Sequence, residues 1–380
     1  MVKNSSLISW ILLLLLLGFS TACGEAEPIV VTKEVIVQTQ ITATPQPTLT
    51  PLPQPTPVGG GSGLLAYATE TEVETDTLAL NMFDLATYNS QLIDETKHLD
   101  FQWSPDGTLL AYRKNPDASE AGIVLFSPQT GTSIPLLEIP LPNMAFGWSP
   151  DSRQVAFLSP LEEETSGGSL YLVNRDGSEL KQIFSNEEFR VIIGPVVEWV
   201  NDETILFTAH TWPDEGTFGL RKVQIYTIHK DGDNLTRMSD YRFDHYLPHL
   251  SPSGDQLVFF SNGEDSEWDL FIMDMQGQNL FLLSEKLVFQ PGWSPDGNRI
   301  VWADAGNIVV FDLVKPDMKT ITSMHEVRSP AWSPDGEWIV FAGKSKENSY
   351  FQLYLVRTDG TELTLLTNAP QNHNNPIWQP

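Results

Sequence analysis

The sequence has very little cysteine and few basic residues. Cys23 is the only cysteine among 380 residues, so no disulfide can form within the chain, and its stability must come from a hydrophobic core. The 22 lysines and arginines face 49 aspartates and glutamates, which gives a formal net charge of −27. Because affinity for nucleic acid depends on Lys and Arg neutralising phosphates, this balance argues against a nucleic-acid partner. It also argues against direct binding to anionic lipid headgroups.

The only long apolar run lies near the N-terminus and is too short to span a membrane. It covers residues 7–19, whereas a spanning helix needs roughly 20 residues. Lys3 precedes the run and the small residues 20–22 follow it, which is typical of a secretory signal peptide. The segment "STAC" (20–23) resembles the lipobox of bacterial lipoproteins, although Ser20 stands where an aliphatic residue is usual. The resemblance implies a signal peptide over 1–22 and lipidation of Cys23; the alternative is an ordinary secretory signal with a chance cysteine.

Residues 23–62 are predicted to form a Pro/Thr/Gly-rich linker between the lipidated cysteine and a folded domain over 63–380. Segment 44–57 contains six prolines, which favour extended polyproline II, and could span roughly 40 Å at about 3.1 Å per residue. The following "GGGSG" (59–63) predicts a flexible joint. We therefore expect a lipid-anchored protein on the outer side of the cytoplasmic membrane, in the bacterial cell envelope.

Short motifs related to "WSPDG" recur through the rest of the chain. Seven segments end at an anchor residue, and successive anchors are 39 to 51 residues apart: Trp103, Trp148, Trp199, Leu250, Trp293, Trp332 and Trp378. Behind the motif come β-rich runs such as "LLAYR" (109–113) and "SLYLVNR" (169–175), then turns rich in Asp and Gly. Four short strands in about 45 residues, repeated, predict an all-β propeller of four-stranded blades.

The two ends of this region are predicted to share one blade. Residues 63–96 match the second, third and fourth strands of a blade, and residues 375–380 match a first strand. Joined in space, they would close the ring and remove the open sheet edges. The count is then seven blades. A ring of six would follow if one degenerate copy, "EWVNDE" (198–203) or "HLSPSG" (249–254), is not a blade.

The repeated Ser-Pro-Asp-Gly suits a type I turn between the first two strands. Proline fits its second position, aspartate its third and glycine its fourth, so acids such as Asp106 are predicted to be turn residues rather than catalytic groups. The motif, with the "LYLV", "DG" and "ELTLLT" elements of 352–367, resembles the WD40-like repeat of TolB-type propellers. That repeat also occurs in the propeller domains of prolyl oligopeptidase-like enzymes. The resemblance covers 63–380 and implies a fold, not a function; the G-x-S-x-G elbow of a hydrolase domain is missing from the sequence.

Candidate binding residues lie just before the anchors, where the loops into the first strands open at one face. Three histidines share the register five residues before an anchor. The candidates are His98, Asn143, His245, His249, Arg328 and His373, with Trp212 in an insertion at 210–222. Three interpretations stay open: solvated loop residues, a mouth that binds a small molecule or peptide, or a metal site. For the insertion, the alternative is a long hairpin packed on its own blade.

Catalytic signals are weak. Asp100 and Glu198 would form an acid–base pair if they faced each other across the channel, as glycoside chemistry requires. No tight pair of metal ligands recurs, and the acidic stretches 231–233 and 262–269 lack the spacing of a calcium loop, so we expect no metal and no cofactor. We predict a monomeric binding module for a protein or extracellular ligand. The alternative is a lyase or glycosidase with its site at the channel mouth.

Overall fold

The computed structural model describes residues 58–72, 77–97, 100–114, 122–137, 145–160, 168–186, 196–211, 222–240, 242–262, 267–285 and 288–380. All regular structure in these ranges is β-strand, arranged as seven four-stranded sheets of antiparallel strands. The described ranges therefore hold no helix that could cross a membrane. The predicted signal peptide, Cys23 and the proline-rich segment lie outside them. The prediction of an all-β propeller with seven blades is confirmed.

The first four blades follow each other along the chain. Blade 1 is β4 (Phe101–Trp103), β5 (Leu110–Lys114), β6 (Gly122–Ser127) and β7 (Thr132–Pro135). Blade 2 is β8 (Phe146–Trp148), β9 (Gln154–Pro160), β10 (Gly168–Asn174) and β11 (Lys181–Asn186). Blade 3 is β12 (Val197–Asn201), β13 (Thr204–Thr211), β14 (Lys222–His229) and β15 (Thr236–Arg237). Blade 4 is β16 (His245–Leu250), β17 (Gln256–Ser261), β18 (Asp269–Asp274) and β19 (Phe281–Ser284).

The last three blades include the one built from both ends of the domain. Blade 5 is β20 (Phe289–Trp293), β21 (Arg299–Asp304), β22 (Asn307–Asp312) and β23 (Asp317–Ser323). Blade 6 is β24 (Glu326–Trp332), β25 (Trp338–Lys344), β26 (Gln352–Arg357) and β27 (Thr364–Leu365). Blade 7 is β28 (His373–Trp378), β1 (Leu64–Glu72), β2 (Thr77–Asp84) and β3 (Asn89–Thr96).

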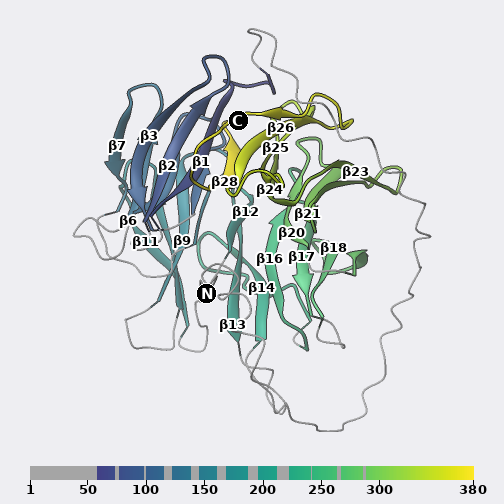
Figure 1. Cartoon of the computed structure of the whole chain (residues 1–380). Coiled ribbons are helices and arrows are strands. Elements are labelled where there is room, and N and C mark those ends of the chain that lie inside the picture. Colours follow the sequence, from purple (N-terminus) through teal and green to yellow (C-terminus); the bar gives the residue numbers. More distant parts are fainter. Residues whose placement is uncertain are drawn as a thin grey trace, which may run out of the picture. The chain divides into compact units, whose positions relative to one another are not determined.

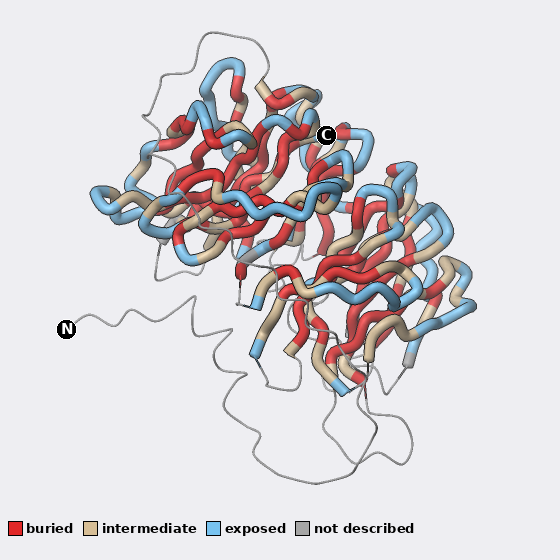
Figure 2. Tube along the Cα trace, turned by 90° about the vertical axis from the view of Figure 1, so that its right-hand side faces the viewer, coloured by how far each residue is buried: buried red, intermediate tan, exposed pale blue. Residues whose placement is uncertain are grey.

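The composite blade closes the ring. The yellow strand β28 lies beside the purple strand β1 in Figure 1, and Trp378 pairs there with Leu65. Each of seven hydrophobic clusters joins two successive blades, including blade 7 with blade 1. In Figure 2 the buried residues follow the strands and the exposed ones gather at the turns. Apolar faces buried between neighbouring sheets therefore hold the ring together.

Four of the six anchor tryptophans connect neighbouring blades by hydrogen bonds as well as by packing, whereas the buried indole N–H groups of Trp103 and Trp148 have no hydrogen-bond partner among the described residues. The indole N–H of Trp199 donates to the carbonyl of Gly147 at 3.0 Å, one blade earlier. Trp332 donates in the same way to Gly292 at 3.1 Å. Trp293 and Trp378 do likewise with the preceding blade. A buried indole N–H usually has a partner, so in these four blades the bond favours Trp over another large apolar residue, while in blades 1 and 2 packing alone accounts for it.

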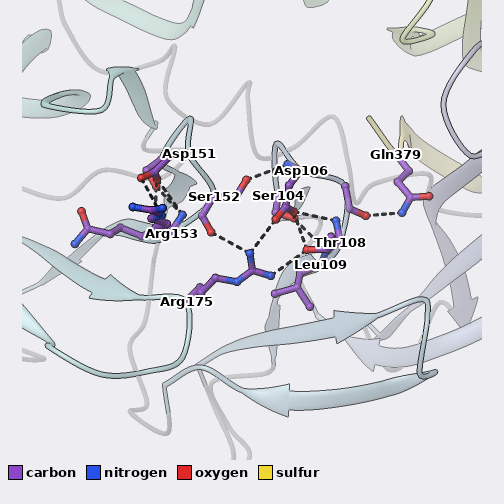
Figure 3. A network of polar contacts seen from close by, with 12 residues as sticks. Ser104, Asp106, Thr108, Leu109, Asp151, Ser152, Arg153, Arg175 and Gln379 are labelled. Atoms are coloured by element: carbon purple, nitrogen blue, oxygen red, sulfur yellow. Dashed lines mark hydrogen bonds and ion pairs between the residues drawn. The ribbon is translucent and has the colours of Figure 1, made fainter.

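The Ser-Pro-Asp-Gly segments are turns that also join blades (Figure 3). Ser104 Oγ donates to Asp106 Oδ1 at 2.6 Å, and Arg175 of blade 2 donates to Asp106 Oδ2 at 2.8 Å. Partial burial opposes ionisation of Asp106, but hydrogen bonds from Ser104, Thr108 and Arg175 hold its pKa well below its usual value. Asp106 is thus an ionised turn residue, as predicted.

The glycine run after the linker folds onto the propeller instead of forming the predicted flexible joint. The amide of Asp335 in blade 6 donates to the Gly59 carbonyl at 3.1 Å, and Val58 packs against the cluster between blades 6 and 7. Gly59 has a φ of 97°, and a Cβ there would lie 2.4 Å from the Trp378 ring. These glycines are needed for a left-handed backbone and a close approach. We call residues 58–62 the strap; they belong to the folded domain, five residues before its predicted start.

Candidate functional site

The direction of the strands gives the propeller two different faces. Every first strand begins at one face, which we call the mouth face, and runs to its Ser-Pro-Asp-Gly turn, or the equivalent turn, at the opposite turn face. Connections between second and third strands, including the predicted insertion at 210–222, join strand ends at the mouth face. The candidates His98, Asn143 and Trp212 lie outside the described residues.

First strands in blades 4 to 7 share a β-bulge at the same place. Two residues, the second always proline, oppose a single buried aromatic of the second strand. The first residue of each pair has φ between 48° and 54°. The bulges are Leu247-Pro248 opposite Phe259, Gln290-Pro291 opposite Trp302, Ser329-Pro330 opposite Phe341, and Asn375-Pro376 opposite Tyr67. Such backbones cost on the order of 1–3 kcal/mol each and cluster at functional sites.

The bulges bring polar side chains from three blades together at the ring centre. Asn375 Oδ1 accepts hydrogen bonds from Ser329 Oγ at 2.7 Å and from Gln290 Nε2 at 3.2 Å. Bulges re-aim side chains, and these three groups come from blades 5, 6 and 7. The signal was visible in the sequence as a proline two residues before the anchor in blades 4 to 7 only, but we did not predict this cluster.

His249 and Glu198 are the predicted site residues that the structure brings into direct contact. Both stand one residue before their anchors, on the adjacent strands β16 and β12. His249 Nδ1 lies 2.8 Å from Glu198 Oε1, and the amide of Leu250 donates to Oε2 at 2.8 Å. The His249 side chain is 43% exposed. Burial opposes its protonation, yet the hydrogen bond and charge of Glu198 raise the pKa of His249 above its usual value.

Replacing Glu198 with glutamine is expected to remove the upward shift of the His249 pKa. Without the carboxylate no negative charge favours the protonated ring, so the pKa should fall towards the unperturbed value of about 6.5. Protonated His249 paired with Glu198 stabilises the fold at pH values below 6.5, and this contribution is lost as the pH rises through the raised pKa, so the variant should lack that pH dependence. NMR titration of the His249 ring protons measures the shift.

Glu203→Gln is the matched control for this titration. Glu203 lies 3.3 Å from His229 at the turn face, so its removal should leave the His249 titration unchanged. An unchanged His249 pKa in Glu198→Gln would contradict the pairing.

Asp100 has a different partner from Glu198. Its carboxylate pairs with the guanidinium of Arg113 on β5 at 2.7 Å. Among the described residues no contact joins Asp100 to Glu198, and no three His, Cys, Asp or Glu side chains lie close enough to hold a metal ion. The two carboxylates of the predicted acid–base pair thus contact different residues: Asp100 contacts Arg113, and Glu198 contacts His249.

His245 and His373 lie in the core instead of lining the mouth. His245 is 5% exposed, packs 5.4 Å from the Phe259 ring and contacts the Asp240 carbonyl at 2.9 Å. His373 is also 5% exposed and packs against Tyr67; burial lowers its pKa to about 4. Valines 288 and 327 occupy the same register and are buried too. Residues five positions before the anchor therefore lie in the interfaces between blades. We expected the histidines at this position to line the mouth because histidine is a polar residue.

Arg328 is held at the mouth face by a ring and a carboxylate. Its guanidinium carbon lies 3.6 Å from the centre of the Phe351 ring, and Nη2 lies 3.8 Å from Glu70 Oε1. Asn372 and Asn374 donate to the two oxygens of Glu70 at 2.7 and 3.0 Å. Stacking on the Phe351 ring and the nearby carboxylate of Glu70 hold the planar guanidinium of Arg328 in place beside the start of blades 6 and 7.

Comparison with protein families gives a match over most of the chain. A family model described as the TolB beta propeller domain matches residues 62–284 and 260–380. An uncharacterized protein of Agrobacterium fabrum is 28% identical over 211 residues, 52% of this chain and 67% of that protein. The uncharacterized peptidase YuxL of Bacillus subtilis is 26% identical over 212 residues, 46% of this chain and 32% of the peptidase. The match thus spans about a third of that relative.

Solved structures share the fold at low sequence identity. TolB from Acinetobacter baumannii superposes with a TM-score of 0.50 at 16% identity, covering 83% of this chain and 82% of that one. An oligogalacturonate lyase in complex with manganese gives 0.58 at 16%, covering 76% and 83%. The β-propeller domain of the trilobed protease from Pyrococcus furiosus gives 0.60 at 16%, covering 81% and 95%. Because the matches include a lyase and a protease domain, the shared fold leaves the function open.

Proposed function

Since the chain belongs to the TolB β-propeller domain family, we propose that it is a binding module of the bacterial cell envelope. In this proposal Cys23 carries a lipid, the proline-rich segment is a stalk, and the mouth face takes a protein or extracellular ligand. The signal-like N-terminus and the family both support a place in the envelope.

The observation that carries the binding proposal is the bulged half of the ring centre. Gln290, Ser329 and Asn375 present amide and hydroxyl groups from three of the four bulges with strained backbones. Positions held so firmly lose little conformational entropy when a ligand binds, which is how preorganised sites gain affinity. Arg328, fixed on Phe351, adds a guanidinium suited to carboxylate or carbonyl groups.

Site-specific photo-crosslinking tests which face binds. Tyr350 is 39% exposed in the connection between β25 and β26 at the mouth face, and Val314 is 67% exposed at the turn face. With p-benzoylphenylalanine at position 350, we expect crosslinks to an envelope component or an extracellular protein in intact cells. The same group at position 314 is the control. Equal crosslinking from both positions, or crosslinks from 314 alone, would contradict binding at the mouth face.

The lipid anchor is tested separately. Metabolic labelling with a radioactive fatty acid should label the wild-type chain and fail in Cys23→Ala, because the lipid would be attached through that thiol. Labelling that persists in the variant would remove the anchor from the proposal. The binding module would then be a secreted one.

A second candidate function is a lyase or glycosidase, favoured by the His249–Glu198 pair. A histidine oriented by a carboxylate is a recurring general base, and its Nδ1 is fixed by Glu198. In this case turnover of an oligosaccharide by the wild type should drop by at least about 100-fold in His249→Ala, in line with the usual contribution of a general base. Turnover that survives the substitution would remove His249 from any catalytic role.

A further inference from the structure

Arg328 is a ring-stacked arginine whose guanidinium makes no hydrogen bond with another described residue. It lies over the Phe351 ring, and its Nε is buried without a partner. Its ion pair with Glu70 is long, since the 3.8 Å between Nη2 and Oε1 exceeds hydrogen-bond distance. Arg299 and Arg357 also stack on rings, but both donate hydrogen bonds at 2.9–3.1 Å. Arg328 thus has N–H donors that its described neighbours leave unused.

Asn374 adds an unpaired acceptor at the same point of the mouth face. Its side chain donates to Glu70 Oε1 at 3.0 Å, while its own Oδ1 is buried and has no partner among the described residues. Asn374 is 4% exposed. Arg328 and Asn374 both stand four residues before their anchors, on the neighbouring strands β24 and β28 (Figure 1). Buried polar groups rarely lack partners, so an unused donor and an unused acceptor beside one carboxylate oxygen call for an explanation.

The charges around the Phe351 ring leave room for an anion. Lys344 lies over the same ring, with Nζ 5.8 Å from its centre and 3.7 Å from Glu326 Oε1. Burial lowers the pKa of Arg328, against the attraction of Glu70 and Glu326. Neither cation is held by a close, two-point contact with a carboxylate. A guanidinium fork is suited to that contact, which a carboxylate from outside the chain could supply.

From these groups we infer that Arg328 and Asn374 form a subsite for a small carboxylic acid that carries an O–H or N–H donor on the carbon beside its carboxylate. The carboxylate accepts from the guanidinium, and the neighbouring donor binds Asn374 Oδ1. The inference rests on the proposed function, because it names the ligand chemistry of the mouth face. Both unpaired atoms are covered by protein, so the guanidinium must shift along the Phe351 ring as the acid binds. Repulsion from the net charge of −27 is screened beyond about 8–10 Å at physiological salt.

Isothermal titration calorimetry of the full chain with four small probes tests the ligand chemistry. Lactate offers a carboxylate and an O–H, and N-acetylalanine offers a carboxylate and an N–H. Propionate lacks the donor, and lactamide lacks the carboxylate. We expect saturable binding of at least one of the first two. Propionate should bind about three- to tenfold more weakly and lactamide at least about tenfold more weakly, as expected for the loss of a neutral and of a charged hydrogen bond.

Substitutions in the subsite test which residues are responsible. Arg328→Gln should weaken binding of the preferred acid at least about tenfold, and Arg328→Lys, which keeps the charge without the fork, should weaken it less. Asn374→Ala should remove the preference over propionate, a ratio that a loss of stability alone would not change. Arg357→Gln is the matched control, because Arg357 stacks on Trp338 at the turn face and should leave the titration unchanged.

The outcomes separate this subsite from the wider binding proposal. The inference is overturned if neither acid binds, if the preferred acid and propionate bind equally, or if Arg328→Gln binds as the wild type does. Crosslinks from position 350 would still support binding at the mouth face in each of these cases. Binding of the acid that depends on Arg328, without any crosslink from position 350, would support the subsite and contradict the larger partner.

Discussion

A Gly59→Ala substitution is expected to lower the free energy of unfolding of the propeller by about 3 kcal/mol, from left-handed backbone strain of roughly 1–2 kcal/mol and overpacking of about 1–3 kcal/mol. The left-handed φ of 97° disfavours any side chain. The new Cβ would also lie 2.4 Å from the Trp378 ring, which is buried in the strand that closes the ring. Urea denaturation followed by tryptophan fluorescence measures the loss.

Gly131→Ala is the matched control for the strap. Gly131 has a φ of 67° in an exposed turn, and a Cβ there would meet no heavy atom within 4 Å. It should show only the strain of a left-handed alanine, roughly 1–2 kcal/mol. Equal losses in the two variants would mean that residue 59 does not pack against Trp378, and the strap would then be a loose linker after all.

Gly147→Ala is expected to destabilise the propeller by about 2–3 kcal/mol through a backbone clash. Gly147 is buried on β8, and a Cβ there would lie 2.3 Å from the carbonyl oxygen of Val197 on β12. Backbone atoms cannot turn aside as a flexible side chain can, so blades 2 and 3 would have to separate. The indole bond from Trp199 to the Gly147 carbonyl would be strained as well. Calorimetry and urea denaturation both measure the effect.

Gly292→Ala provides the comparison at the equivalent position of blade 5. Both glycines stand one residue before an anchor tryptophan, but a Cβ on Gly292 would lie 3.6 Å from Val301 Cγ1, an ordinary contact. We expect a change within about 0.5 kcal/mol. A similar large loss at both positions would show that the register itself, and not the close approach of blades 2 and 3, requires glycine.

The blade architecture could be predicted because its signals are local and repeated. Turn chemistry in Ser-Pro-Asp-Gly and the spacing of anchors such as Trp103 and Trp148 depend on short segments, and seven copies average out their irregularities. The degenerate copies ending at Trp199 and Leu250 still form β12 and β16. The ring has seven blades rather than six because both degenerate copies form blades whose sheet faces are buried against neighbouring blades, as in the other copies.

The candidate site could be predicted only in part because side-chain direction depends on register and bulges. His249 and Glu198 were both predicted site residues, and they meet because each stands one residue before its anchor on adjacent strands. His245 and His373 shared a register but are buried, since the facing sheet covers that position. The cluster at Asn375 escaped prediction because a bulge shifts the pleat, and partners 46 and 85 residues away cannot be read from spacing.

Sequence by itself determined the repeat, the turns, the composite blade and the acidic character, because these follow from local propensity and composition. Only the tertiary structure decided that the glycines at 59 to 61 form a strap, that Asp100 pairs with Arg113, and that four inner strands are bulged. The physical reason is the same in each case. A glycine permits both flexibility and close approach, a carboxylate permits many partners, and a proline permits several backbones, until the neighbouring blades select one.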